Sequence, residues 1–241
     1  MIRRSSIVTC ALALVAAGAL AVQDAVKIAW APKAGKTSKY SVHAKFRVDI
    51  GSGEQDVNYK MTVTQKVLEV MEDGKVKIEE KVGNQSLVIG DQDMSEMVQG
   101  MDYGTTYVFL PNGEVHERKM DGPQEMDNPR MEDAMAFIYP GKELKPGETW
   151  TRSTKADSSK GRVATETVYT FRGVETIDGK KVSKIDVKFK ELEGDLPTTG
   201  EGTVWLGDEG DVVKGEYKLN NIIFAEGVPP VNATMTMQRV E

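Results

Sequence analysis

Two well-separated stretches of this chain repeat the same short strand–turn–strand phrase. The first is TTYVFLPNGEV, residues 105–115, and the second is GTVWLGDEGDV, residues 202–212. Each phrase contains a Thr followed by β-forming residues, one of them aromatic, and then a Leu. A turn that ends in Gly comes next, and an acidic residue and a Val follow the turn. A chain that contains this phrase twice has to form a similar hairpin at two points, which predicts an architecture of two similar halves.

Other segments alternate apolar and polar residues with the period of a half-buried strand. In residues 40–50, apolar side chains fall on one face and Ser, His, Lys, Arg and Asp on the other. Residues 59–67, 75–82 and 182–190 follow the same rule, which predicts an antiparallel sheet with one solvated face. Four dipeptides supply the positive φ angles of tight hairpins; they are Asp73-Gly74, Asn112-Gly113, Asp178-Gly179 and Glu209-Gly210.

Two segments have helical rather than strand periodicity. In residues 93–101, apolar side chains recur at i, i+3, i+4 and i+7. In residues 128–138, Asn128 is a candidate N-cap and Pro129 occupies the first helical position. The apolar residues predicted to share one face of each helix are Met94, Met97, Val98 and Met101 in the first, and Met131, Ala134, Met135 and Ile138 in the second.

The repeated phrases occur in the same order in both parts of the chain. Residues 32–40 correspond to 144–150, and residues 62–76 correspond to 167–182. If the two parts are copies of one β-meander, Leu110 should match Leu206 and Gly74 should match Gly179.

The predicted fold class is therefore mainly β with two short helices. We expect a curved antiparallel meander built from two similar halves, at about 30–118 and 140–224, which forms a half-barrel or a sandwich. The connections are short and no Pro- or Ser-rich spacer divides the halves, so we assign residues 22–241 to a single domain.

The first 21 residues have the organisation of a signal peptide. MIRRSS is a basic n-region, an apolar stretch follows, and Ala19-Leu20-Ala21 forms an A-x-A cleavage signature. Cys10, the only cysteine, lies inside that stretch, so the mature chain would contain no disulfide and would depend on core burial. We expect an exported protein, periplasmic or extracellular, with no transmembrane segment after cleavage.

The net charge of the chain limits which classes of binding partner are expected. Removal of Arg3 and Arg4 leaves 29 basic residues against 37 acidic ones, a net charge of −8. Nucleic acids and anionic membrane surfaces select basic faces, so we predict no nucleic-acid partner.

The sequence resembles a group of exported bacterial proteins of unknown function. The resemblance rests on WAPKAGKTSKY, YPGKELKPGETW and GTVWLGDEGDV, because that group carries a P…GxxW element and a late Val-aromatic-Leu…Gly hairpin. More distantly, the plan is similar to lipoprotein-localisation-factor-like half-barrels, curved sheets that cup an apolar ligand under short helices. The resemblance implies a half-barrel and supplies no catalytic motif.

No pattern of reactive residues points to catalysis. His43 and His116 fall at polar positions of predicted strands, and neither H-E-x-x-H nor G-x-S-x-G occurs. We therefore predict no enzyme activity, no cofactor and no metal site.

Methionine is concentrated in one part of the sequence, since seven of the 12 methionines lie between residues 94 and 135. Met fills irregular gaps in cores, repacks around varied apolar guests and, as a thioether, can bind Cu(I). Against copper, no Cys or nearby His pair supports the thioethers. The candidate ligand-binding residues are Met94, Met97, Met101, Met131 and Met135, and their helical spacing predicts that they point toward the sheet.

We therefore expect an exported non-catalytic binding protein that carries a hydrophobic ligand or lipid in the cell envelope. The alternative is a structural or protein-interaction module that meets another envelope protein and has no small-molecule ligand. If the methionine-faced helices stand off a concave sheet, the carrier is favoured; if they seal a dry core, the interaction module is favoured.

The cleavage signature generates a direct prediction. The mature protein should begin at Val22, because signal peptidases cut after an A-x-A sequence. Intact-mass measurement of exported material checks this, and a mass that still includes residues 1–21 would contradict it.

Overall fold

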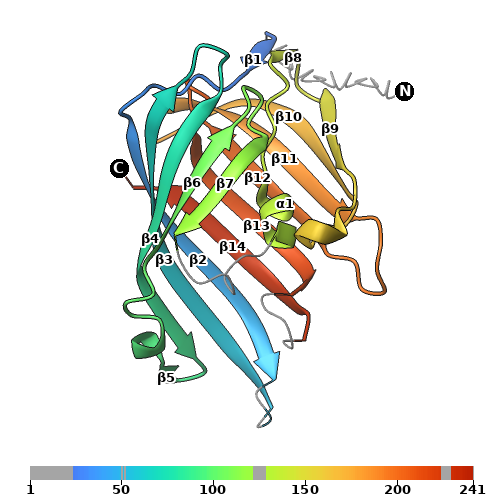
Figure 1. The fold of residues 1–241 in the computed structure, drawn as a ribbon. Helices are drawn as coiled ribbons and strands as arrows, with labels where there is room; N and C mark the ends of the chain where they lie inside the picture. Colours follow the sequence, from blue (N-terminus) through green and yellow to red (C-terminus); the bar gives the residue numbers. More distant parts are fainter. Residues whose placement is uncertain (1–23, 50, 52, 122–128, 224–228, 241) are drawn as a thin grey trace, which may run out of the picture.

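A large antiparallel sheet dominates the computed structural model of the protein (Figure 1). The structure describes residues 24–240 apart from 50, 52, 122–128 and 224–228. The predicted signal peptide of residues 1–21 and the predicted cap at Asn128 lie outside the described residues.

The elements have the following bounds: β1 Val26–Ile28, β2 Thr37–Asp49, β3 Glu54–Val70, β4 Val76–Ile89, β5 Gln92–Asp93, η1 Ser95–Met97 (a 3-10 turn), β6 Tyr103–Phe109, β7 Val115–Asp121, α1 Pro129–Met135, β8 Lys142–Leu144, β9 Thr149–Thr154, η3 Ser158–Lys160 (a 3-10 turn), β10 Thr165–Ile177, β11 Lys180–Glu191, β12 Thr199–Leu206, β13 Val212–Ile222 and β14 Val231–Arg239.

The strand order repeats as the sequence predicts. Along the sheet the order is β7-β6-β4-β3-β2-β14-β13-β12-β11-β10-β9, with β5 beside β4 and a separate pair formed by β1 and β8. β2-β3-β4-β6-β7 and β9-β10-β11-β12-β13 are therefore equivalent meanders, and β14 joins them edge to edge. Leu110 follows β6 and Leu206 ends β12, while Gly74 and Gly179 occupy the turn between the second and third strands of each copy.

The sheet curves without closing, so it forms a half-barrel rather than a sandwich (Figure 1). β7 and β9 are its two edges, and helix α1 lies on the concave side between them. Met131 and Met135 of α1 pack against a core built on the inner faces of β10 to β13. The predicted curved antiparallel meander of two similar halves is confirmed.

Two rows of directly opposed residues cross the concave face at neighbouring levels. We call the first the aromatic row; it consists of Trp150, Tyr169, Val187, Gly202, Tyr217, Met235, Ala44, Tyr59 and Leu87. We call the second the arginine row; it consists of Arg152, Thr167, Phe189, Gly200, Leu219, Ala233, Phe46, Val57 and Ile89.

Two glycines of β12 make room for large side chains in these rows. A Cβ added to Gly202 would lie 2.5 Å from the carbonyl oxygen of Glu216 and from the ring of Tyr217. A Cβ added to Gly200 would lie 2.4 Å from Leu219. The missing side chains let Tyr217 and Leu219 of β13 pack over β12, where both are buried.

The two repeated hairpins meet at one end of the half-barrel on a single aromatic residue, Tyr139. The Tyr139 hydroxyl donates to the carbonyl of Gly210 at 2.6 Å, and its backbone N–H donates to the carbonyl of Asn112 at 2.7 Å. Trp30 stacks on Tyr139, with 5.8 Å between the ring centroids. Gly113 is required here because its φ is +85° and an added Cβ would lie 2.8 Å from Tyr139.

The tight packing at Gly202 predicts a stability difference between two strand glycines. Gly202→Ala should lower the free energy of unfolding by roughly 1–3 kcal/mol, because the new methyl group displaces backbone or the Tyr217 ring. Gly104→Ala is the matched control, since the nearest atom to its Cβ is 3.7 Å away. Urea denaturation measures both variants, and equal losses of stability would contradict the packing argument.

Candidate functional site

Helix α1 is the element that organises the concave face. Pro129 occupies its first position, as predicted, where a missing N–H costs no hydrogen bond. Ala134 is buried, and Met131, Met135 and Ile138 pack against the core of β10 to β13. The predicted apolar face is confirmed for Met131, Ala134 and Met135, which point inward, whereas the helix ends at Met135 and Ile138 lies beyond it.

The other predicted helix is replaced by a 3-10 turn, η1, which lies beside β4 and β5. The prediction that Met97 and Met101 point toward the sheet is wrong, because these side chains are 58% and 47% exposed, respectively. Met94 is half-buried. Pairing of β4 with β5, and a hydrogen bond from the Leu87 N–H to Ser95 Oγ, hold this segment along the strand edge rather than over the sheet.

The five candidate methionines are therefore not gathered in one place. Met131 and Met135 lie under α1, whereas Met94, Met97 and Met101 lie with η1 at the edge of β4. A ligand role for any of them stays a prediction.

Two carboxylates of α1 form ion pairs with both edges of the open sheet. Asp133 Oδ1 accepts a hydrogen bond of 2.8 Å from Arg152 Nη2 on β9. Glu132 Oε2 lies 3.8 Å from Arg118 Nη1 on β7 and 3.3 Å from Arg162 Nη2. Adjacent helix residues thus bridge strands that do not pair with each other.

A second buried ion pair ties the start of α1 to the end of β11. Arg130 donates to both oxygens of Glu191, at 2.7 and 2.6 Å, and the Thr198 N–H donates at 2.6 Å. Burial by itself would raise the pKa of Glu191, but the hydrogen bonds from Arg130 and Thr198 outweigh it and lower that pKa.

Sequence analysis missed these charged groups, although the strand pattern contains a signal for them. Arg152 stands two residues after Trp150, and Glu191 stands two residues after Phe189, so alternation places both charges on an inward face. A charge in register with inward aromatics indicates a buried ion pair. The partners on α1 could not be identified in this way.

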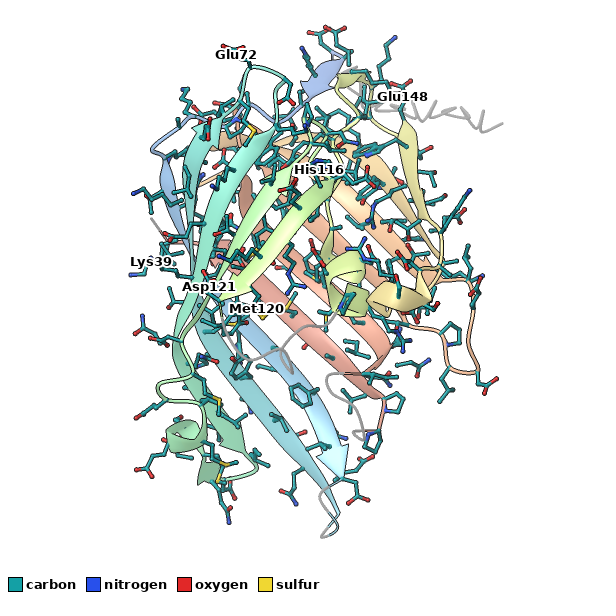
Figure 2. All side chains as sticks on the ribbon, in the orientation of Figure 1. Lys39, Glu72, His116, Met120, Asp121 and Glu148 are labelled. Atoms are coloured by element: carbon teal, nitrogen blue, oxygen red, sulfur yellow. The ribbon has the colours of Figure 1, made fainter. Side chains whose placement is uncertain are left out.

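The side chains of the aromatic row become less buried where the row passes from β13 to β14. Tyr169, Val187 and Tyr217 are buried, whereas Met235, Ala44, Tyr59 and Leu87 are only half-buried. Together with Phe46 and Met61, which are also half-buried, these last four residues form what we call the apolar strip. It lies on the inner faces of β14, β2, β3 and β4, and Met120 at the lower end of β7 appears in front of these strands in Figure 2.

Tyrosines of the concave face carry hydroxyls that stay protonated near neutral pH. Burial raises the pKa of Tyr59 to about 12 and that of Tyr169 to about 12. The Tyr59 hydroxyl donates to Gln85, and the Tyr169 hydroxyl donates to the carbonyl of Ala136 at 2.9 Å. These rings therefore present uncharged surface.

The two histidines lie outside the buried core. His43 opposes Lys60 on the outer face of β2, and burial together with Lys45 and Lys60 lowers its pKa. His116 is exposed on β7 (Figure 2). Within the described ranges, no group of three or more His, Cys, Asp or Glu side chains is placed to hold a metal ion.

Two shallow hollows, of about 450 and 430 Å³, lie on the sheet, and the second adjoins the apolar strip at Phe46. The first is lined by residues of β2, β3, β4 and β6 that include Lys39, Lys81 and Asp102, and the second by residues that include Phe46, Val57 and Asn232. Neither contains a candidate methionine.

In the part of the chain that the structure describes, no helix is long and apolar enough to span a membrane.

Comparisons with known proteins do not show a family. No family model matches the sequence, and no curated protein matches it. One similar structure is that of DynF from the dynemicin biosynthesis pathway of Micromonospora chersina, with 10% identity over 92% of this chain and 86% of that chain, and a TM-score of 0.27. A DUF1329 family protein from Desulfovibrio piger has 11% identity over 84% of each chain and a TM-score of 0.20.

The Arg130–Glu191 pair predicts a pH-dependent contribution to stability. The pKa of Glu191 is lower in the folded state than its ordinary value of 4.5, so its stabilising contribution is present above pH 4.5 and is lost as the pH falls below it. Glu191→Gln should cost roughly 3 kcal/mol at pH 7, because Arg130 loses its partner, and should remove this part of the acid sensitivity.

Thermal and urea unfolding between pH 3 and pH 7 measure this effect. Glu201→Gln is the control, since Glu201 is exposed on the outer face of β12; it should change the free energy of unfolding by no more than about 0.5 kcal/mol. The same acid-induced loss of stability in Glu191→Gln as in the unaltered protein would contradict the assignment.

Proposed function

We propose that this chain is an exported, non-catalytic binding protein that holds an apolar ligand on the apolar strip of its concave face. The ligand class is a lipid or another elongated non-polar molecule. The proposal makes the first meander the binding half and the second meander the packed half.

The observation that carries this proposal is the uneven burial of the aromatic row. Its members on β10, β11 and β13 are buried beneath α1 and the segment that follows it. Its members on β14, β2, β3 and β4 face the same concave side but keep part of their surface in water. Apolar surface that is exposed on a concave face is typical of a ligand-binding groove.

The chemistry of the apolar strip fits a flexible hydrophobic guest. Met61 and Met235 adapt their side chains to different shapes, since thioethers have low rotational barriers and no branching. Tyr59 adds a ring whose hydroxyl is already bonded to Gln85, so a non-polar ligand would leave no new buried polar group unsatisfied there. Ala44 provides space between the larger side chains.

The alternative function, an interaction module of the envelope, is favoured by a different observation. Leu192 and Leu196 are exposed on the loop between β11 and β12, and large exposed apolar side chains occur at protein interfaces. β13 separates this loop from the apolar strip in the sheet order, so a side chain that fills the strip would leave Leu192 and Leu196 exposed.

A tryptophan placed on the apolar strip tests the proposal. Ala44→Trp should fill the strip and weaken binding of N-phenyl-1-naphthylamine, an uncharged fluorescent apolar probe, by about tenfold or more, which corresponds to about 1.4 kcal/mol. Ser41→Trp is the matched control, because Ser41 is exposed on the outer face of the same strand.

Fluorescence titration of the full chain measures this difference, and thermal melting shows whether each variant is folded. Binding that is unaffected by Ala44→Trp in a folded protein would place the probe elsewhere. No probe binding by the unaltered protein would contradict the carrier proposal and leave the interaction module as the better hypothesis.

A further inference from the structure

The edge strand β9 turns a row of backbone hydrogen-bonding groups away from the sheet. β9 ends the strand order (Figure 1), and among the described residues it pairs with β10 alone. The Phe171 N–H of β10 donates to the carbonyl of Glu148 at 3.0 Å. Because hydrogen bonds alternate along an antiparallel pair, every second residue after Glu148 also turns its backbone groups toward β10. The residues between them, whose backbone groups point outward, are Thr149, Thr151 and Ser153.

The side chains of β9 give this edge little protection against pairing. Free sheet edges are commonly protected by charged side chains or by Pro. The opposite edge strand, β7, carries four charged residues, namely Glu117, Arg118, Lys119 and Asp121. β9 has the sequence TWTRST, and its only charged residue, Arg152, is bonded to Asp133 of α1. Its outer face carries only Thr and Ser side chains, all exposed. The edge at β9 is therefore open to another strand.

The sequence of β9 is compatible with pairing to its own copy. Two copies of a strand that pair antiparallel about a two-fold axis place one residue directly opposite itself. With Thr151 at that centre, Thr149 opposes Ser153 of the second copy, and Thr–Thr and Thr–Ser pairs are favourable across strands. On the concave face, Trp150 opposes Arg152 of the second copy, so no like charges meet. This register also joins all the outward backbone groups of β9.

β7 does not offer an equivalent register. Its three central positions are Glu117, Arg118 and Lys119. Whichever of these residues lies on the two-fold axis meets the same charge on the second copy, and like charges directly opposite each other destabilise a strand pair. Charge therefore selects β9, rather than β7, as the self-complementary edge.

We infer that two copies of this chain pair through β9, antiparallel and centred on Thr151, so that their sheets join across a two-fold axis. The partner at this edge is a second copy of the chain, added as a neighbouring strand. β10, β11, β12 and β13 separate β9 from the strands of the apolar strip. The inference therefore goes beyond the proposed function and does not depend on it.

A single engineered cysteine tests the register. In a full chain that carries Cys10→Ser, Thr151→Cys supplies the only thiol. Opposed Cα atoms in a hydrogen-bonded antiparallel pair are about 5.5 Å apart, a distance that a disulfide spans. Thr151→Cys should therefore give a disulfide-linked dimer when it is oxidised with copper–phenanthroline.

Thr149→Cys is the matched control, because Thr149 is exposed on the same face of the same strand. In the inferred register, four residues, about 13 Å of strand, separate position 149 from its own copy. This variant should therefore cross-link at least about tenfold more slowly than Thr151→Cys, since a disulfide cannot span that distance.

Sedimentation velocity measures the association without a cross-link. The unaltered full chain should show a reversible monomer–dimer equilibrium as its concentration rises. Thr151→Pro removes an N–H that points away from β10, so each copy keeps its own sheet hydrogen bonds while the central intermolecular bond is lost. Thr151→Lys places like charges at the centre. Each variant should weaken dimerisation about tenfold or more, which corresponds to about 1.4 kcal/mol.

Ser41→Lys is the charge control, because Ser41 is exposed on the outer face of β2, away from both edges; it should leave the dimer unchanged. Thermal melting shows whether each variant is folded. A chain that stays monomeric, a dimer that persists in folded Thr151→Lys, or equal cross-linking of Thr149→Cys and Thr151→Cys would each overturn the inference. None of these results bears on probe binding at the apolar strip, so failure of the proposed function is detected separately.

Discussion

The half-barrel depends on how its two free edges are held. An open antiparallel sheet presents unpaired backbone groups along its outermost strands, and such edges favour pairing with other chains. Here α1 lies between the edges, with Glu132 beside Arg118 of β7 and Asp133 bonded to Arg152 of β9. Because a buried carboxylate that loses its partner is costly, these contacts oppose separation of the edges. These charges therefore help to hold the geometry of the concave face.

The same helix makes the two meanders unequal. In the second meander, α1 and the aromatic residues that follow it complete a core in which Tyr169, Phe171 and Ile185 have no exposed surface. The equivalent concave surface of the first meander carries no comparable helix among the described residues, because the segment around η1 lies at the edge of β4. A repeated architecture therefore has one half that is mainly structural and one half that keeps apolar surface available.

Most of the fold could be predicted from the sequence, because strand alternation and Gly-containing turns are local signals. The hairpins at Gly74 and Gly179 and the matched order of the strands were found in this way. The η1 segment could not be, since its methionines have helical spacing but the edge of β4 captures the chain through backbone pairing. The pairing of the charged groups beneath α1 could not be predicted either, because Asp133 and Arg152 meet only through the curvature of the sheet.

Tyr139 has a thermodynamic consequence for the whole molecule. It lies between the two copies in the sequence and bonds to the hairpin turn of each, at Asn112 and at Gly210. Loss of either hairpin would expose a buried aromatic ring that the other hairpin also needs, so neither copy can melt without weakening its neighbour. β14 couples them again, since it pairs with the first strand of one copy and the last strand of the other. Such shared contacts make unfolding cooperative, with both copies lost in a single transition instead of two.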